Sequence, residues 1–233
     1  MTNAEREPLD VLEAIHSTPA RRFLGSDPIP DEILWELLNA AIRGPTGGNS
    51  QIWGWVVVRD EAKKAQIAEW WKGVFEATYG RADPAALEGG GRVQFSDFDK
   101  VVDAETGLDA SGLRSVTYLA NHIGEAPVLM VPVITGVIGG PESTRTGITY
   151  GGFIFGAIQN LALAARAYGI GAPLTTFGTG PKLDALLELP EGSTAVAIVP
   201  LGYPIRGRFS QPRRMPVESV VHFDTWGNQQ ERP

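Results

Sequence analysis

Three groups of residues in the 233-residue chain could bind an anion or a polar ligand. Two are arginine pairs, Arg21-Arg22 and Arg213-Arg214, and adjacent guanidinium groups suit a phosphate. The third is the glycine-rich loop at 44–51, in which Asn49 and Gln51 carry amides that both donate and accept hydrogen bonds. That loop suits a polar heteroaromatic ring or a ribityl chain. Each arginine pair alone is equally compatible with a solvated basic turn, whereas an ordinary helix end explains Gly44 and Pro45 of the loop but not the Asn-Ser-Gln that follows.

The residues that catalyse reactions without a cofactor are largely missing. The chain has no cysteine, which excludes disulfides, a cysteine nucleophile, iron–sulfur ligation and a thiolate zinc site. It has no GxxxxGK[ST], HExxH or GxSxG motif, and residues 169–174 begin like GxGxxG but lack the third glycine. The three histidines, His16, His122 and His222, are far apart in the sequence and favour structural roles over a metal site. Redox chemistry would therefore need a bound organic cofactor.

Composition and charge narrow the class of protein further. The formal net charge is −7 and the pI is about 5.0, which argues against a nucleic-acid partner. Hydrophobic residues make up 43%, as in a folded domain. Residues 1–8 are polar, and the longest apolar run, 128–138, is far shorter than the roughly 20 residues of a membrane span. We therefore expect a cytoplasmic protein with no membrane partner.

The elements that must position these groups follow from hydrophobic periodicity. Helices are predicted at 9–16, 31–42, 61–79, 113–124, 151–168 and 182–188, and strands at 55–58, 128–134 and 195–201. The helix at 151–168 is apolar on nearly all sides, which predicts burial in a core or a subunit interface. Without repeats or a clean linker, residues 1–233 are expected to form one domain. Residues 70–115, which include the aperiodic segment 80–112, would be a variable lid, and 202–233 a C-terminal extension.

In order along the chain, several motifs resemble those of the FMN-dependent nitroreductase family. They are ARRF at 20–23, GPTGGNSQIW at 44–53, QNLALAARAYGIG at 159–171, LGYP at 201–204 and RRMPVESVVH at 213–222. The similarity covers nearly the whole chain, and the loop and the 159–171 helix together are specific. The resemblance implies an α+β fold in which helices sandwich a central, mostly antiparallel sheet, and an intertwined homodimer with two FMN sites at its interface.

The resemblance also assigns a role to each group of residues, with no catalytic side chain and no metal. Arg21 and Arg214 would hold the FMN phosphate, with Arg22 and Arg213 as weaker candidates. The loop residues would reach the flavin from the partner subunit: Thr46, Gly47, Gly48, Asn49 and Gln51. The segment Thr175-Thr176-Phe177 lies where the family directs a backbone N–H at flavin N5.

One departure from the family pattern concerns the phosphate. Where the family usually carries Arg-Arg-Ser, this chain has Ser17-Thr18-Pro19. Two cationic contacts are therefore missing, and a proline replaces a residue that could donate to the ribityl chain. The departure predicts either weaker FMN binding or substitution by another cation.

The favoured function is an NAD(P)H-dependent FMN oxidoreductase with a ping-pong mechanism. The reduced flavin would pass its electrons to a nitroaromatic, a quinone or a similar small-molecule acceptor. Two alternatives stay open at this point. One is a flavin-dependent dehydrogenase (desaturase) or dehalogenase of a particular metabolite. The other is a flavin-binding protein without turnover, which the departure at Ser17-Thr18-Pro19 favours. The acceptor and the choice between NADH and NADPH are left open as well.

Overall fold

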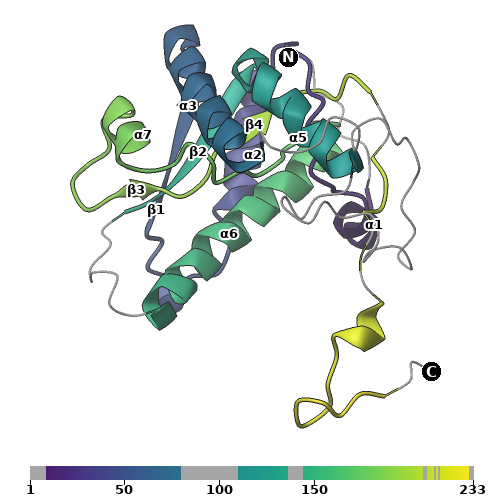
Figure 1. Ribbon diagram of the computed structural model, residues 1–233. Helices are drawn as coiled ribbons and strands as arrows, with labels where there is room; N and C mark the ends of the chain where they lie inside the picture. The colour runs from purple at the N-terminus through teal and green to yellow at the C-terminus, as the bar shows by residue number, and fades with distance from the viewer. Residues whose placement is uncertain are drawn as a thin grey trace.

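A central antiparallel sheet organises the chain. The computed structural model describes residues 9–79, 110–135, 144–206, 209–212, 214 and 216–230. The sheet has four strands: β1 (Trp53–Val58), β2 (Val128–Ile134), β3 (Thr194–Ala195) and β4 (Val199–Leu201). β2 pairs with β1 on one side and with the short strands β3 and β4 on the other, always antiparallel (Figure 1). The predicted antiparallel sheet is thus confirmed.

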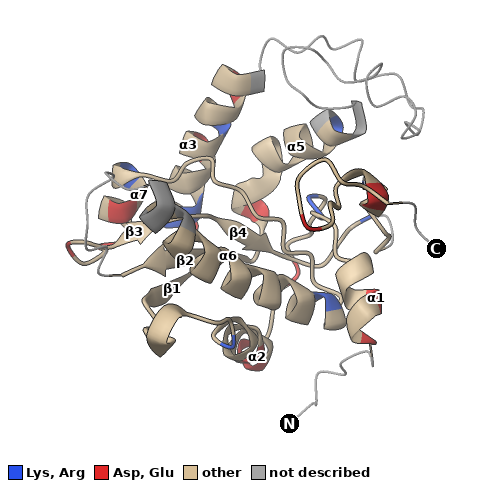
Figure 2. Cartoon of the chain, turned by 90° about the horizontal axis from the view of Figure 1, so that it is seen from below, with Lys and Arg blue, Asp and Glu red and all other residues tan. Residues whose placement is uncertain are grey.

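Helices cover both faces of this sheet, as predicted. On one face lie α2 (Asp31–Ala41) and α6 (Thr144–Ala167), and on the other α3 (Glu61–Tyr79), α5 (Ala110–His122) and α7 (Pro181–Leu186) (Figure 2). Every residue of β2 is buried. Its side chains alternate, so that Val128 and Met130 join the core under α2 and α6 while Leu129 and Val131 join the core under α3 and α5. Burial on both faces explains the continuous apolar run of β2.

The predicted strand at 195–201 is divided into β3 and β4. Between them Ile198 pairs with Thr175 instead of with β2. This interruption lies where β2 carries Pro132, whose carbonyl accepts from the Val196 N–H at 3.0 Å. The N and C=O of one strand residue point to the same side, so the missing N–H of Pro132 faces the interruption. A proline is therefore tolerated in the middle of the sheet.

The predicted helices are all present, with ends that shift by a few residues. α1 (Val11–His16) packs against α6, and α5 continues into the 3-10 turn η3 (Ile123–Glu125). α6 begins seven residues before the predicted start at residue 151 (151 − 144 = 7). Of the predicted lid, residues 80–109 lie outside the described residues, and its two ends belong to α3 and α5.

α6 is buried on one side only. Ile154, Ala157, Ile158 and Leu161 are in the core, but Phe155 is 39% exposed and Gln159 is exposed. Burial in the core is therefore confirmed for one side of this helix, and burial of the other side in a subunit interface stays a prediction. The exposed side leaves an apolar surface beside the end of α1.

Beyond the sheet, the end of the C-terminal extension, residues 216–230, projects away from the rest of the chain (Figure 1). It contains the 3-10 turn η4 (Val217–Ser219) and a loop closed by the Phe223 N–H, which donates to the Asn228 carbonyl at 2.8 Å. Trp226 at the tip of this loop is 90% exposed. None of the described helices is long and apolar enough to span a membrane.

Candidate functional site

A cavity of about 330 Å³ lies on the exposed side of α6. Three segments line it: the connection after α1, the middle of α6 and the chain just after α6. The lining residues are Thr18, Pro19, Ala20, Phe155, Ile158, Gln159, Ala162, Ala172 and Leu174. The cavity is mostly apolar, with Gln159 and Thr18 as its side-chain hydrogen-bonding groups.

Gly171 lets two of these segments approach closely. Its N–H donates to the Gly202 carbonyl at 2.9 Å. A Cβ on Gly171 would lie 2.7 Å from Leu24 Cδ2 and 2.9 Å from Arg21 Cβ, closer than real Cβ atoms come. Because glycine has no side chain, the Arg21 backbone can lie directly against the chain that follows α6.

The Arg21 side chain has two buried donor atoms that are not used within the described part of the chain. Its Nε and Nη2 atoms are buried and have no hydrogen-bond partner among the described residues. Burial lowers the pKa of Arg21, and the nearby charge of Arg166 lowers that pKa further. Buried donors without partners are costly to the free protein and mark a site where a ligand can supply acceptors.

Arg166 is a second buried cation, in the last turn of α6, one helical turn after the cavity-lining Ala162. It is only 8% exposed, and its Nε donates to Ser17 Oγ at 3.1 Å. The Arg166 and Arg21 guanidinium carbons lie 4.4 and 5.6 Å from the centre of the same Phe209 ring. Two guanidinium groups thus converge beside the cavity. An oxyanion with several acceptor oxygens, such as a phosphate monoester, fits this donor set.

The other predicted arginines lie elsewhere or outside the described residues. Arg22 donates through Nη1 to Ser115 Oγ on α5 at 3.2 Å. Its neighbour Arg21 instead lies with Arg166 against the Phe209 ring. Arg214 is exposed in the C-terminal extension. Arg213 lies outside the described residues.

The predicted flavin loop is exposed and does not line the 330 Å³ cavity of its own chain. It forms the 3-10 turn η1 (Gly47–Asn49), in which Gly48 has φ +59°, and Asn49 and Gln51 also have positive φ angles. Thr46 Oγ1 accepts from the Gln51 N–H at 3.1 Å and closes the turn. A Cβ on Gly47 would lie 3.2 Å from Phe153 Cζ, so the loop packs against α6.

The predicted N5-facing segment is held by partly buried hydrogen bonds of Thr175. Thr175 exchanges two backbone hydrogen bonds with Ile198, and its Oγ1 accepts from Trp71 Nε1 at 3.0 Å and from the Phe177 N–H at 3.2 Å. The Thr175 and Phe177 amides are therefore already engaged. The Thr176 N–H has no partner among the described residues, so it is the amide of this trio that can bind a ligand.

Sequence reasoning did not single out Phe209, Trp71 or Arg166 as members of this site, and it named Ser17 only as a position where a cation of the family is missing. Arg166 carried the one available signal, since it is a charged residue inside an otherwise apolar helix. No local pattern could show that it meets Ser17, which is 149 residues away.

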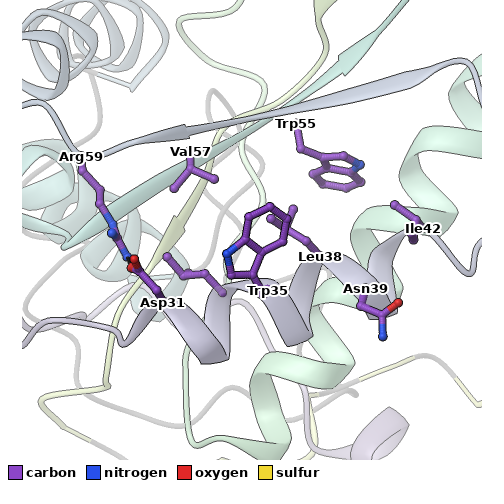
Figure 3. Close-up of a pocket in the computed structure, with 9 residues that line it drawn as sticks. Asp31, Trp35, Leu38, Asn39, Ile42, Trp55, Val57 and Arg59 are labelled. Atoms are coloured by element: carbon purple, nitrogen blue, oxygen red, sulfur yellow. Dashed lines mark ion pairs between the residues drawn. The ribbon is translucent and has the colours of Figure 1, made fainter.

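A second cavity, of about 540 Å³, lies between α2 and the edge strand β1 (Figure 3). Trp35, Leu38, Trp55 and Val57 give it an apolar lining, and an ion pair between Asp31 and Arg59 lies at one end (Figure 3). None of the predicted site residues lines this cavity. Among the described residues, no cluster of His, Asp and Glu could hold a metal ion.

The fold and the site together define an α+β protein whose antiparallel sheet lies between helical layers, with a phosphate-compatible cation pair beside α6. Comparison with known families makes the class specific. Residues 16–203 match the model of the Nitroreductase family, so the chain belongs to that family of flavin-dependent oxidoreductases. The resemblance stated from the sequence motifs is confirmed.

Individual relatives carry different activities in their names. The chain is 30% identical over 223 residues to an NADH dehydrogenase of Thermus thermophilus. The aligned residues make up 91% of this chain and 97% of that protein. It is 25% identical over 207 residues to iodotyrosine deiodinase 1 of Rattus norvegicus. Here the aligned residues make up 85% of this chain and 63% of the deiodinase. The chain thus spans less than two thirds of the deiodinase.

Solved structures share the fold. An oxidized iodotyrosine deiodinase bound to FMN and 3-iodo-L-tyrosine superposes with a TM-score of 0.65 at 21% identity, over 93% of this chain and all of that one. An NADPH:FMN oxidoreductase of Vibrio harveyi complexed with NAD⁺ gives a TM-score of 0.63 at 19% identity, over 94% of this chain and 79% of that one. At these identities the likeness supports the fold alone.

Proposed function

We propose that the protein is an FMN-dependent oxidoreductase that takes electrons from NAD(P)H and passes them to a nitroaromatic, a quinone or a similar acceptor. The observation that carries this proposal is the Arg21 side chain. Its buried Nε and Nη2 have no hydrogen-bond partner in the described part of the chain, and it directly follows Ala20, which lines the 330 Å³ cavity. When bound, FMN would supply the hydride and electron chemistry, and the alternation of donor and acceptor at one flavin makes the kinetics ping-pong.

The chain's own residues bind and orient the cofactor. Arg21 holds the phosphate, with Arg22, Arg213 and Arg214 as further predicted contacts. The Thr176 N–H is the available donor toward the flavin ring, and the hydrogen bonds of Thr175 keep it in place. The apolar side of α6 excludes water from the ring, and no side-chain acid or base is required.

The functional unit in this proposal is a homodimer. In a single chain the predicted flavin loop at 46–51 is exposed, and α6 exposes Phe155 beside the cavity. A partner that covers this side of α6 would bury Phe155 and bring its own loop to the flavin. Light scattering should then give about twice the chain mass of 25.0 kDa, because a twofold dimer is the commonest closed assembly. A monomer that binds FMN would refute this arrangement.

Absorbance spectroscopy tests the function directly. The purified protein is loaded with FMN and mixed anaerobically with NADH or with NADPH, and loss of the flavin band reports reduction. Initial rates at several acceptor concentrations should give parallel double-reciprocal lines. Flavin binding without reduction by either nucleotide would favour the alternative of a non-catalytic flavin protein. Failure to bind flavin would overturn the proposal.

Reductive dehalogenation is a second candidate, and the similarity to several iodotyrosine deiodinases favours it. The experiment is to reduce the FMN-loaded protein with dithionite and add 3-iodo-L-tyrosine, with a nitroaromatic as the comparison acceptor. Iodide release faster than nitroaromatic reduction would select dehalogenation. Oxidation of the reduced protein by the nitroaromatic alone would select the nitroreductase reaction.

A further inference from the structure

Arg166 is a candidate replacement for one of the two missing cations of the phosphate site. We propose that Arg166, held by Ser17, is a second phosphate-binding residue for FMN, an inference that rests on the proposed flavin-dependent function. Ser17 occupies a position where the family usually carries an arginine. The cation is thus supplied from the last turn of α6 rather than from the connection after α1.

The burial of Arg166 is the first observation. Arginine is rarely buried unless its charge is compensated. Arg166 is 8% exposed, and the described carboxylate beside it is that of Glu13, whose Oε1 lies 4.0 Å from Nη2. The Glu13 side chain is itself 61% exposed, so the solvent screens this pair strongly. The ion pair with Glu13 is therefore weak, and a phosphate with a charge near −2 is the kind of oxyanion that two neighbouring guanidinium groups bind.

The placement of Arg166 is the second observation. Thr18, Pro19 and Ala20 line the cavity, and the residues that flank this segment are Ser17 and Arg21. Ser17 binds Arg166 Nε, and Arg21 carries the buried donors without partners. The two guanidinium groups also share the Phe209 ring. The same short segment thus lines the cavity and sets the position of both cations.

A purely structural role makes a different prediction for the neighbouring carboxylate. If Arg166 served only to tie α1 to α6 through Glu13, then loss of either partner would act in the same direction. If Arg166 binds a phosphate, Glu13 competes with that phosphate for the cation. Glu13→Gln should then strengthen FMN binding while Arg166→Gln weakens it.

The experiment compares the affinities for FMN and for riboflavin, which lacks the phosphate, by quenching of flavin fluorescence. Arg166→Gln should weaken FMN binding by roughly 10- to 100-fold and change riboflavin binding less than about twofold. Arg166→Lys should retain part of the preference for FMN, since lysine keeps the positive charge but not the planar guanidinium that can donate two parallel hydrogen bonds. Glu13→Gln should tighten FMN binding by roughly 2- to 5-fold. Arg59→Gln, an exposed charge at the 540 Å³ cavity, is the matched control and should change neither affinity.

Three results would overturn the role of Arg166: an unchanged preference for FMN in Arg166→Gln, an equal loss of both flavins, or weaker FMN binding in Glu13→Gln. Should Arg166→Gln not fold, Ser17→Ala and Arg166→Lys decide the matter, because an unchanged preference in both contradicts the proposal. A wild-type protein that binds both flavins equally refutes the phosphate contact but leaves the flavin function standing. A wild-type protein that binds neither flavin refutes the proposed function itself.

Discussion

Replacement of Arg21 by methionine should make the flavin-free protein more stable and the flavin-loaded protein less stable than wild type. Methionine keeps an unbranched apolar side chain as far as the position of Nε but removes the guanidinium group, and with it the buried charge and the N–H groups of Nε and Nη2 that have no partner among the described residues. Each buried donor without a partner costs about 1–3 kcal/mol. Arg21 is only half-buried and also gives up its contact with Phe209, worth about 0.5–1 kcal/mol, so the net gain should be about 1–2 kcal/mol.

The binding of FMN should change in the opposite direction. The loss of a charged hydrogen-bond partner of the phosphate costs about 1.5–3 kcal/mol, or roughly 10- to 150-fold in affinity. At an FMN concentration 1,000 times the wild-type Kd, wild type gains about 4.1 kcal/mol of stability, whereas a variant with about 100-fold weaker binding gains only about 1.4 kcal/mol. Arg21→Met should therefore be more stable than wild type without FMN and less stable than wild type when FMN is added.

Thermal melting with and without FMN measures this inversion. In a chain of this size 1 kcal/mol shifts Tm by about 2–4 °C, so Arg21→Met should raise the Tm of the flavin-free protein by roughly 2–8 °C. Arg59→Met is the control. The sequence suggests a solvated strand-end charge there, and the structure shows a half-exposed ion pair with Asp31, which is worth about 0–1 kcal/mol. A flavin-free Arg21→Met protein that melts below wild type while its FMN affinity is unchanged would refute the reasoning.

Three further substitutions test the elements around the site. Gly171→Ala should destabilise the protein by about 1–3 kcal/mol in urea unfolding and weaken FMN binding, because its Cβ would displace Arg21 and Leu24; wild-type FMN affinity in this variant would argue against a phosphate role for Arg21. Gly48→Val should cost about 1–2 kcal/mol of stability through its φ of +59° alone, since a Cβ there meets open space within the chain. It should also lower FMN affinity more than Asn49→Ala does, and equal affinities would remove the loop from the flavin site. Trp71→Phe should lower the free energy of unfolding by about 1–3 kcal/mol, because it removes the hydrogen bond to Thr175. A double-mutant cycle with Thr175→Val should show a coupling energy of at least about 0.5 kcal/mol. Additive effects would show that the bond does not stabilise this segment.

The sequence alone determined the elements and the family of this protein. Periodicity placed α3 at the residues found, and the apolar run at 128–134 became the buried central strand. Such signals are local, because the side-chain period of a helix or a strand depends only on the chain's own repeat. The arginine pair at 21–22 was also visible, but not that Arg21 and Arg22 point to different neighbours.

The tertiary structure decided which of these residues meet. Arg166, in the last turn of α6, reaches Ser17 after α1, and Trp71 on α3 reaches Thr175, more than 100 residues later in the chain. Contacts of this kind depend on how the faces of helices pack against a sheet and on where a glycine such as Gly171 permits close approach. These are properties of long-range packing, and no spacing within a single segment encodes them. The cation pair beside α6 therefore emerges only when the chain is folded.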